Sequence, residues 1–233
     1  MARLPRLAFA GHAHLVLLRG LGHHAVFVDD EDRRAFLTAL GAVCQREEVA
    51  LHGYALLRDR VWLLCTPSAA DALSRAMQAL GRHYTAVVNR RHARRGGLWD
   101  GRYRSAAIEA GTRTLEAMIF VDQVAASDRV DEAAWSSASQ HIGLEPILPL
   151  TDAAEYWALG NTPFDRAAAY RELLMERQSA ALQQTLTASV ERGWPVGSED
   201  FLRALQLRSS RPVTPRSRGR PRKVLAKPTS GPP

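Results

Sequence analysis

The chain has 233 residues, of which 46% are hydrophobic, and its 31 basic and 24 acidic residues give a formal net charge of +7. This hydrophobic fraction excludes an intrinsically disordered protein and suffices for one domain of ordinary size with extensions. No apolar run approaches the roughly 20 residues that a membrane-spanning helix needs, so the sequence predicts a cytoplasmic protein without membrane association.

Apolar periodicity and turn residues predict alternating strands and helices in the first half of the chain. In order, they are a strand at 14–18, a helix at 29–48, strands at 49–57 and 61–66, a long helix opening at 67–68, a strand at 102–109 and a helix at 114–126. The connection Arg58–Arg60 is too short for a crossover, so its two strands form a hairpin, which excludes a doubly wound parallel sheet. The order predicts an α+β protein with a ferredoxin-like antiparallel sheet and helices on one face.

The organisation changes after Val130. Helices are expected at 153–159, 163–186 and 198–207, and from Arg208 the mixture of Arg, Ser, Pro and Gly cannot bury apolar surface. We therefore divide the chain into a core domain at 1–130, a helical extension packed on that core at 131–207, and a disordered basic tail at 208–233.

Positive charge concentrates at the C-terminal end. From Phe201 onward there are nine basic residues and no acidic one, which leaves 22 basic against 24 acidic residues in 1–200. Such an end favours a polyanionic partner, and nucleic acid fits better than a membrane because no amphipathic apolar face accompanies the charges.

Several motifs, in order along the chain, resemble the REP-associated tyrosine transposases, which are single-tyrosine HUH transposases. The matching segments are Ala2-Arg-Leu-Pro-Arg6, Gly11-His-Ala-His14, Arg19-Gly20, Leu73-Ser-Arg75, Met77-Gln78, Leu80-Gly-Arg82, Gly97-Leu-Trp-Asp-Gly-Arg-Tyr-Arg-Ser105, Trp135-Ser-Ser137 and Ala168-Ala-Tyr-Arg171. The resemblance implies a protein that cuts single-stranded DNA beside short hairpins, with a tyrosine nucleophile and a divalent metal such as magnesium.

Carried over residue by residue, the resemblance implies that the catalytic groups are missing. Arg60 and Trp62 stand at the positions of the two metal-binding histidines, Phe120 at that of the nucleophilic tyrosine, and Val124 at that of the third metal ligand. Phe120 has no hydroxyl with which to attack phosphorus, and a guanidinium is always protonated and offers no lone pair. We therefore expect no catalytic residues, no metal ligands and no cofactor.

The apparatus for binding DNA is expected to remain. Arginines and aromatic residues interleave in one stretch with a single acid, Asp100, as is typical of surfaces that bind single strands. The candidate residues are Arg75, Arg82, Arg90, Arg91, Arg94, Arg95, Trp99, Arg102, Tyr103 and Arg104. A solvated helix face is the alternative interpretation.

A second candidate lies in the tail, where Arg218-Gly-Arg-Pro-Arg-Lys223 resembles an AT-hook. Its residues Arg218, Arg220, Arg222 and Lys223 would enter the narrow minor groove of A·T-rich duplex DNA, although a generic basic tail explains them equally well.

Three hypotheses follow. The first is a non-catalytic DNA-binding protein that recognises hairpin or single-stranded DNA at the nucleoid, with a homodimer as an option. The second is an active transposase with a relocated site. Of the N-terminal histidines His12, His14, His23 and His24, the alternate pair His12 and His14 could bind a metal weakly, although the resemblance implies histidines there that are not ligands. The third is a decayed transposase-derived protein with no role on DNA.

Overall fold

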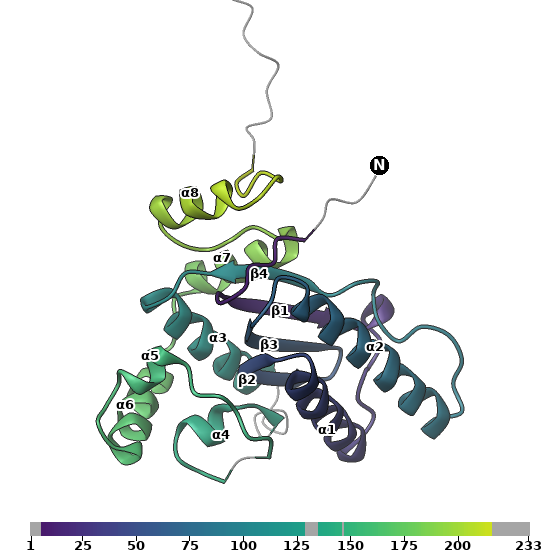
Figure 1. Ribbon diagram of the computed structural model, residues 1–233. Coiled ribbons are helices and arrows are strands. Elements are labelled where there is room, and N and C mark those ends of the chain that lie inside the picture. Colours follow the sequence, from purple (N-terminus) through teal and green to yellow (C-terminus); the bar gives the residue numbers. More distant parts are fainter. Residues whose placement is uncertain (1–5, 129–134, 146, 216–233) are drawn as a thin grey trace, which may run out of the picture.

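The computed structural model describes residues 6–128, 135–145 and 147–215, and it confirms the α+β class (Figure 1). The strands are β1 (Ala13–Arg19), β2 (Val49–Leu57), β3 (Arg60–Pro67) and β4 (Arg104–Ile108). They form one antiparallel sheet in the order β2-β3-β1-β4, which is the ferredoxin-like arrangement.

The helices follow the predicted order, with more interruptions toward the C-terminus. They are α1 (Asp30–Arg46), α2 (Ala72–Arg91), α3 (Thr112–Asp128), α4 (Ala138–His141), α5 (Ala154–Trp157), α6 (Pro163–Met175), α7 (Ala180–Arg192) and α8 (Glu199–Leu207), with a 3₁₀ turn at Leu21–His23. The helix predicted at 163–186 is two helices, because the Ser179 hydroxyl accepts from the Leu182 N–H and caps a new N-terminus. No helix in the described ranges is long and apolar enough to cross a membrane.

The hairpin expected between the second and third strands is present. Leu57 pairs with Arg60 across a two-residue turn, and the register then continues to Val49 opposite Pro67. The register shifts between Leu51 and Gly53, so this edge strand carries one irregularity.

Helices cover both faces of the sheet, whereas the sequence led us to expect them on one face. The predicted arrangement holds for α1 and α2, which share a core with Val61 and Leu63 of β3. The alternate residues Trp62 and Leu64 are equally apolar and pack with α3 and α7 on the opposite face. A strand that is apolar on both sides needs cover on both sides.

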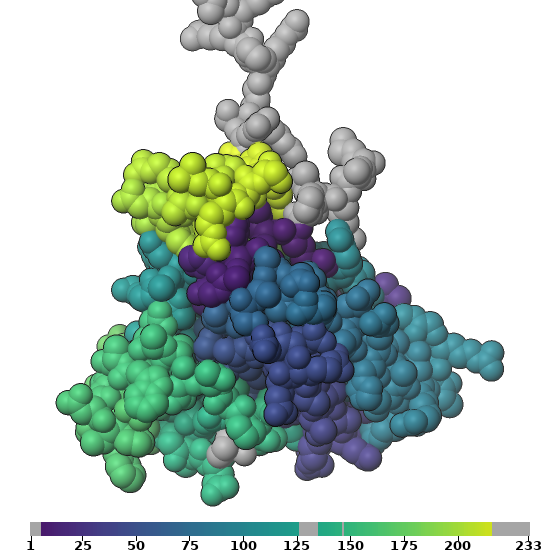
Figure 2. Space-filling view, in the orientation of Figure 1, coloured from purple at the N-terminus to yellow at the C-terminus, as the bar shows by residue number. Residues whose placement is uncertain are grey.

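The C-terminal extension closes the free edge of β4. Ile108 forms a parallel bridge with Val196, and α8 packs over the N-terminal segment through Leu7, Phe9 and Leu205 (Figure 2). Residues 208–215, assigned to the tail from the sequence, belong to this layer because Val213 is 3% exposed.

Candidate nucleic-acid interface

Two of the four positions that the sequence resemblance aligns with catalytic groups lie against each other. Trp62 of β3 and Phe120 of α3 pack edge to face, with ring centroids 5.0 Å apart and an interplanar angle of 89°. Each residue is 3% exposed, so this part of the sheet is a packed apolar core. Trp62 Nε1 has no hydrogen-bond partner in the described part of the chain.

The other two positions offer no metal ligand either. Arg60 is half-buried and donates from Nε to Asp59 Oδ1 at 2.7 Å, while Val124 packs into the same core as Trp62. A guanidinium, an indole, a phenyl ring and an isopropyl group supply no lone pair to a cation, so these residues do not fit a divalent metal. Within 6–128, 135–145 and 147–215, no three His, Cys, Asp or Glu side chains are grouped to hold one.

The N-terminal histidines have other partners. His14 Nδ1 donates to the His12 carbonyl at 2.8 Å, and His14 Nε2 accepts from the Phe9 N–H at 3.2 Å. Burial lowers the pKa of His14 to about 4, so the ring is neutral. Both of its nitrogens are occupied by these two hydrogen bonds. His12 Nε2 lies 3.0 Å from the Arg208 guanidinium, and His23 Nδ1 lies 3.2 Å from Asp59 Oδ2.

A buried polar cluster, which we call the Asp122 network, joins α3 to the C-terminal extension. Asp122 Oδ2 accepts from Tyr170 OH and from His141 Nδ1, both at 2.7 Å, and Asp122 Oδ1 accepts from the Ser137 hydroxyl. His141 Nε2 donates to the His52 carbonyl at 3.0 Å. Since both ring nitrogens donate, His141 is an imidazolium. Burial alone would lower its pKa, but the Asp122 carboxylate outweighs burial and raises it.

Sequence reasoning did not find the Asp122 network, although its signal was present. Ser137 and Tyr170 belong to two of the matched motifs, Trp135-Ser-Ser137 and Ala168-Ala-Tyr-Arg171. Each motif is short and polar, and nothing in the sequence pairs it with an acid on the third helix. The structure shows that both motifs hold the extension against the core.

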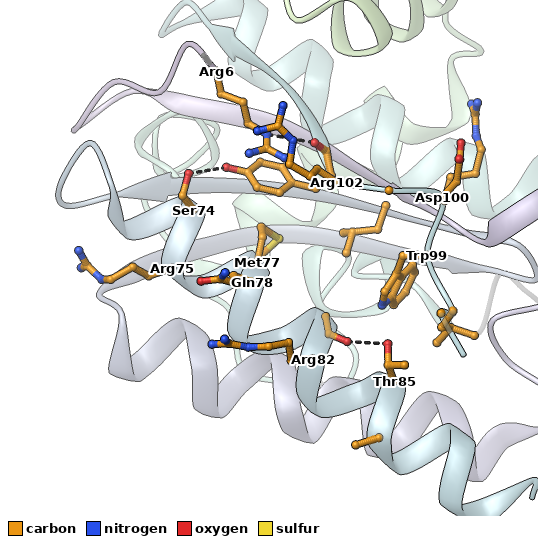
Figure 3. A pocket seen from close by; sticks show the side chains of 18 of the residues that line it. Arg6, Ser74, Arg75, Met77, Gln78, Arg82, Thr85, Trp99, Asp100 and Arg102 are labelled. Carbon is orange, nitrogen blue, oxygen red and sulfur yellow. Dashed lines mark hydrogen bonds between the residues drawn. The ribbon is translucent and has the colours of Figure 1, made fainter. Parts of the chain in front are cut away.

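A large concavity lies on the other side of the sheet. It is a groove of about 870 Å³ between α2 and the loop at 97–103, and we call it the arginine groove (Figure 3). Its cationic side chains are Arg6, Arg19, Arg75, Arg82 and Arg102, and its acids are Asp71 and Asp100. Of the candidate DNA-binding residues, it brings together Arg75, Arg82, Trp99, Arg102 and Tyr103.

The two aromatic residues of the groove have different surroundings. Tyr103 is held in place, because its hydroxyl lies 3.0 Å from Ser74 Oγ and the Arg6 guanidinium stacks 3.8 Å from its ring centroid (Figure 3). Trp99 packs against Tyr84 at a centroid distance of 6.1 Å. Its Nε1 has no hydrogen-bond partner within the described ranges, and it lies beside Gly81 of α2.

The charges of the groove fall into two groups. Arg75 is engaged by Glu47 at 2.7 Å and by Asp71, and Arg104, just beyond the groove, lies 3.6 Å from Asp100. Arg82 and Arg102 are exposed, and neither has an acidic partner within 4.0 Å in the described part of the chain. The uncompensated positive charge of the groove is therefore carried mainly by these two residues.

Arg91 is paired with acidic residues at the start of α1. It forms ion pairs with Asp29 at 2.8 Å, Glu31 at 2.7 Å and Asp32 at 2.6 Å, and so joins the end of α2 to the start of α1. The hydrogen bond from Arg91 lowers the pKa of Asp29 to about 2. Arg91 is thus neutralised within the protein and does not face the groove.

The remaining candidate residues lie beyond the groove or outside the described residues. Arg90, Arg94 and Arg95 are exposed at the end of α2 and in the turn that follows it. The AT-hook-like segment at 218–223 is not among the described residues.

Comparisons with known proteins identify the fold. No model of a protein family matches the sequence, and no curated protein matches it either. Among solved structures, a REP-associated tyrosine transposase bound to a REP hairpin is similar, with a TM-score of 0.50 and 14% identity over 66% of this chain and 96% of that one. A protein from Deinococcus radiodurans assigned provisionally as a transposase has a TM-score of 0.35 and 20% identity over 48% of this chain and 90% of that one. The similarity to the first of these structures shows that the chain has a transposase-like fold.

Proposed function

We propose that this protein binds DNA in the arginine groove, that it prefers hairpins carrying a single-stranded flank, and that it does not cleave them. The observation that carries the proposal is that the exposed, uncompensated guanidinium groups of Arg82 and Arg102 line the same groove as Trp99. Guanidinium groups pair with phosphates and stack on bases, and an indole adds an apolar wall.

A single strand suits the groove better than a duplex. Bases in a duplex are already stacked and paired, so only an unpaired base is available to aromatic and guanidinium planes. The transposase of similar fold is bound to a REP hairpin, which supports the choice of a hairpin as the DNA. The resemblance of the Gly97–Ser105 motif to the same family supports it independently.

The packed contact between Trp62 and Phe120 supports the loss of catalysis. A transposase of this type needs an accessible nucleophile and metal ligands beside it. Here the corresponding side chains are buried against each other and bear no suitable atoms. The hydrogen bonds of both His14 nitrogens argue against a relocated metal site at that residue.

The basic tail is proposed to add affinity with little selectivity for DNA structure. Its Arg218, Arg220, Arg222 and Lys223 would contact phosphates or an A·T-rich minor groove. A deletion that tests this role begins at 216 instead of 208, so that the buried Val213 and the layer around it remain. It should weaken binding to duplex and hairpin alike and reduce the salt dependence by about one log–log unit per lost phosphate contact.

The groove is tested by fluorescence anisotropy with a flanked hairpin and a duplex of equal length, at about 0.15 M salt. We expect the double variant Arg82→Ala, Arg102→Ala to bind the flanked hairpin about tenfold or more weakly, since hydrogen bonds to charged groups contribute about 1.5–3 kcal/mol each. The matched control is Arg34→Ala, Arg177→Ala, which removes two exposed arginines outside the groove.

The control pair should change affinity by less than about threefold. An equal loss in both double variants would mean that binding depends on net charge alone, and the groove would be rejected as the site. If the full-length protein binds neither DNA, the proposed function fails and a decayed protein without a role on DNA replaces it.

A further inference from the structure

A second, smaller hollow adjoins the arginine groove at the end of β4. It has a volume of about 230 Å³ and lies between β4 and the C-terminus of α7; we call it the α7 hollow. Arg6, Arg102 and Tyr103 line both concavities, so the groove and the hollow are neighbouring parts of one surface.

The α7 hollow is lined by five arginines and one acid. The arginines are Arg6, Arg102, Arg104, Arg192 and Arg211. The acid, Glu191, is already paired, because its Oε1 accepts from Arg19 Nη2 at 2.8 Å. Arg104 also lies 3.6 Å from Asp100, which does not line the hollow. Arginines still outnumber acids in the lining, and Glu191 is engaged by Arg19.

The C-terminal extension builds one wall of the hollow. Gly193 ends α7 in the left-handed conformation, with φ +70°, and its carbonyl accepts from Arg211 Nη2 at 3.3 Å. A Cβ at this position would lie 3.7 Å from both Arg211 Nη2 and the Ser105 carbonyl, which shows how closely the end of α7, the Arg211 guanidinium and β4 approach one another. The Trp194 ring lies 5.0 Å from the same guanidinium.

Two features of the hollow favour an anionic ligand. Burial lowers the pKa of Arg211, and although a guanidinium stays charged, a partly desolvated charge gains from an anion nearby. Ser105 is 6% exposed and lines the hollow, and its hydroxyl has no hydrogen-bond partner in the described ranges. A phosphate accepts from several guanidinium and hydroxyl groups at once.

We propose that the α7 hollow binds a backbone phosphate of the single strand whose neighbouring nucleotides occupy the arginine groove. This inference rests on the proposed function and adds to it the path of the bound strand. The strand passes from the groove over Arg102 and Tyr103 to Arg192, toward the C-terminal extension. Phosphate contacts of this kind fix the register of a bound strand without reading its sequence.

The test asks whether the effect of removing one arginine depends on the charge of one phosphate of the DNA. Each phosphodiester of the single-stranded flank is replaced in turn by a neutral methylphosphonate, and each flanked hairpin is titrated against the full-length protein and its Arg192→Ala variant. Arg192 is exposed and has no ion pair in the described part of the chain, so its replacement should leave the fold intact. Arg177→Ala is the matched control, because this exposed arginine lies near the opposite end of α7, about 20 Å away.

We expect one methylphosphonate position to weaken binding of the unaltered protein by about tenfold and to have almost no effect on Arg192→Ala. The control variant should keep the full sensitivity at that position. Equal sensitivity of all three proteins at every position, with tight binding of the unmodified hairpin, would overturn the inference and leave the proposed function standing. Absence of binding to any hairpin would instead reject the proposed function.

A free phosphate or nucleotide is the other source of the same chemistry, and inorganic phosphate is the probe for it. If phosphate alone bound to the protein without DNA, and Arg192→Ala abolished that binding while the methylphosphonate profile stayed the same, the hollow would be a site for a small anion. That outcome would overturn the assignment to a DNA backbone.

Discussion

The two faces of the sheet differ in exposure and charge. On the face covered by α3, Trp62 and Phe120, which the sequence resemblance aligns with catalytic positions, are packed against each other and closed to solvent. On the face covered by α2, Arg82, Arg102 and Trp99 line an open groove. One sheet can thus carry a charged concave surface on one side and a packed apolar core on the other, because binding a polyanion needs exposed donors whereas packing needs only apolar volume.

The largest effect is expected from breaking the Asp122 network, which holds the α3 face closed. Asp122→Ala leaves the His141 imidazolium buried without its carboxylate, and loss of one partner of a buried pair costs about 3–5 kcal/mol of unfolding free energy. Urea unfolding measures this, with the exposed Glu172→Ala of α6 as a control expected within about 0.5 kcal/mol of the unaltered protein. A cost below about 1 kcal/mol for Asp122→Ala would mean that the network does not secure this face.

A smaller effect on the free energy of unfolding is expected from His14, on the groove side of the molecule, and it depends on pH. His14 anchors the N-terminal segment that carries Arg6 to the groove, and its folded pKa of about 4 lies below the ordinary 6.5. Its contribution to stability is complete above pH 6.5 and is lost as the pH falls toward 4, for a total of about 3 kcal/mol. His141, with a raised pKa, acts in the opposite sense: its contribution is complete below pH 6.5 and is lost at higher pH.

The difference between unfolding free energies at pH 7 and pH 4.5 isolates the His14 contribution. His14→Gln cannot titrate, so its loss of stability over this range should be smaller than that of the unaltered protein by up to about 3 kcal/mol. Other groups titrate in both proteins and largely cancel in the comparison. An identical loss in both proteins would mean that the neutral form of His14 is not the one that the fold requires.

The smallest stability effect is expected from restoring the nucleophile alone. Phe120→Tyr adds a hydroxyl to a packed apolar site, at a cost of about 1–3 kcal/mol, and should give no cleavage because no group polarises the phosphate. A nicking assay on flanked hairpin DNA with magnesium measures this. The combined variant Arg60→His, Trp62→His, Phe120→Tyr, Val124→Asn places at all four positions the residues that the sequence resemblance implies, and it is the positive comparison. Cleavage by Phe120→Tyr alone would contradict the view of this face as inert core.

The sequence predicted the elements of the sheet well, for local reasons. The hairpin at 54–67 follows from alternating apolar residues on either side of a charged turn, and the acidic residues at 29–32 mark the start of the first helix. Cover on the second face was not predicted, although the apolar residues on both sides of β3 required it. The break before Ser179 was missed because a single capping serine is a weak signal inside a helical pattern.

The sequence predicted which residues make up the candidate site, but not which of its arginines form ion pairs. The arginine-rich stretch identified the residues of the groove, yet nothing local separates Arg82 from Arg91. Only the fold brings Arg91 to the acids of α1, about 60 positions earlier in the chain, and neutralises it there. The α7 hollow escaped prediction for the same reason, since Arg104, Arg192 and Arg211 meet only in three dimensions.

Hydrogen–deuterium exchange of the full-length protein with and without a flanked hairpin tests the contrast between the two faces most directly. We expect slower exchange in peptides covering 97–103 and the first half of α2, and unchanged exchange in peptides covering 60–64 and 117–125. Protection confined to 60–64 and 117–125, with none in the loop at 97–103, would place the DNA on the α3 face and contradict the account.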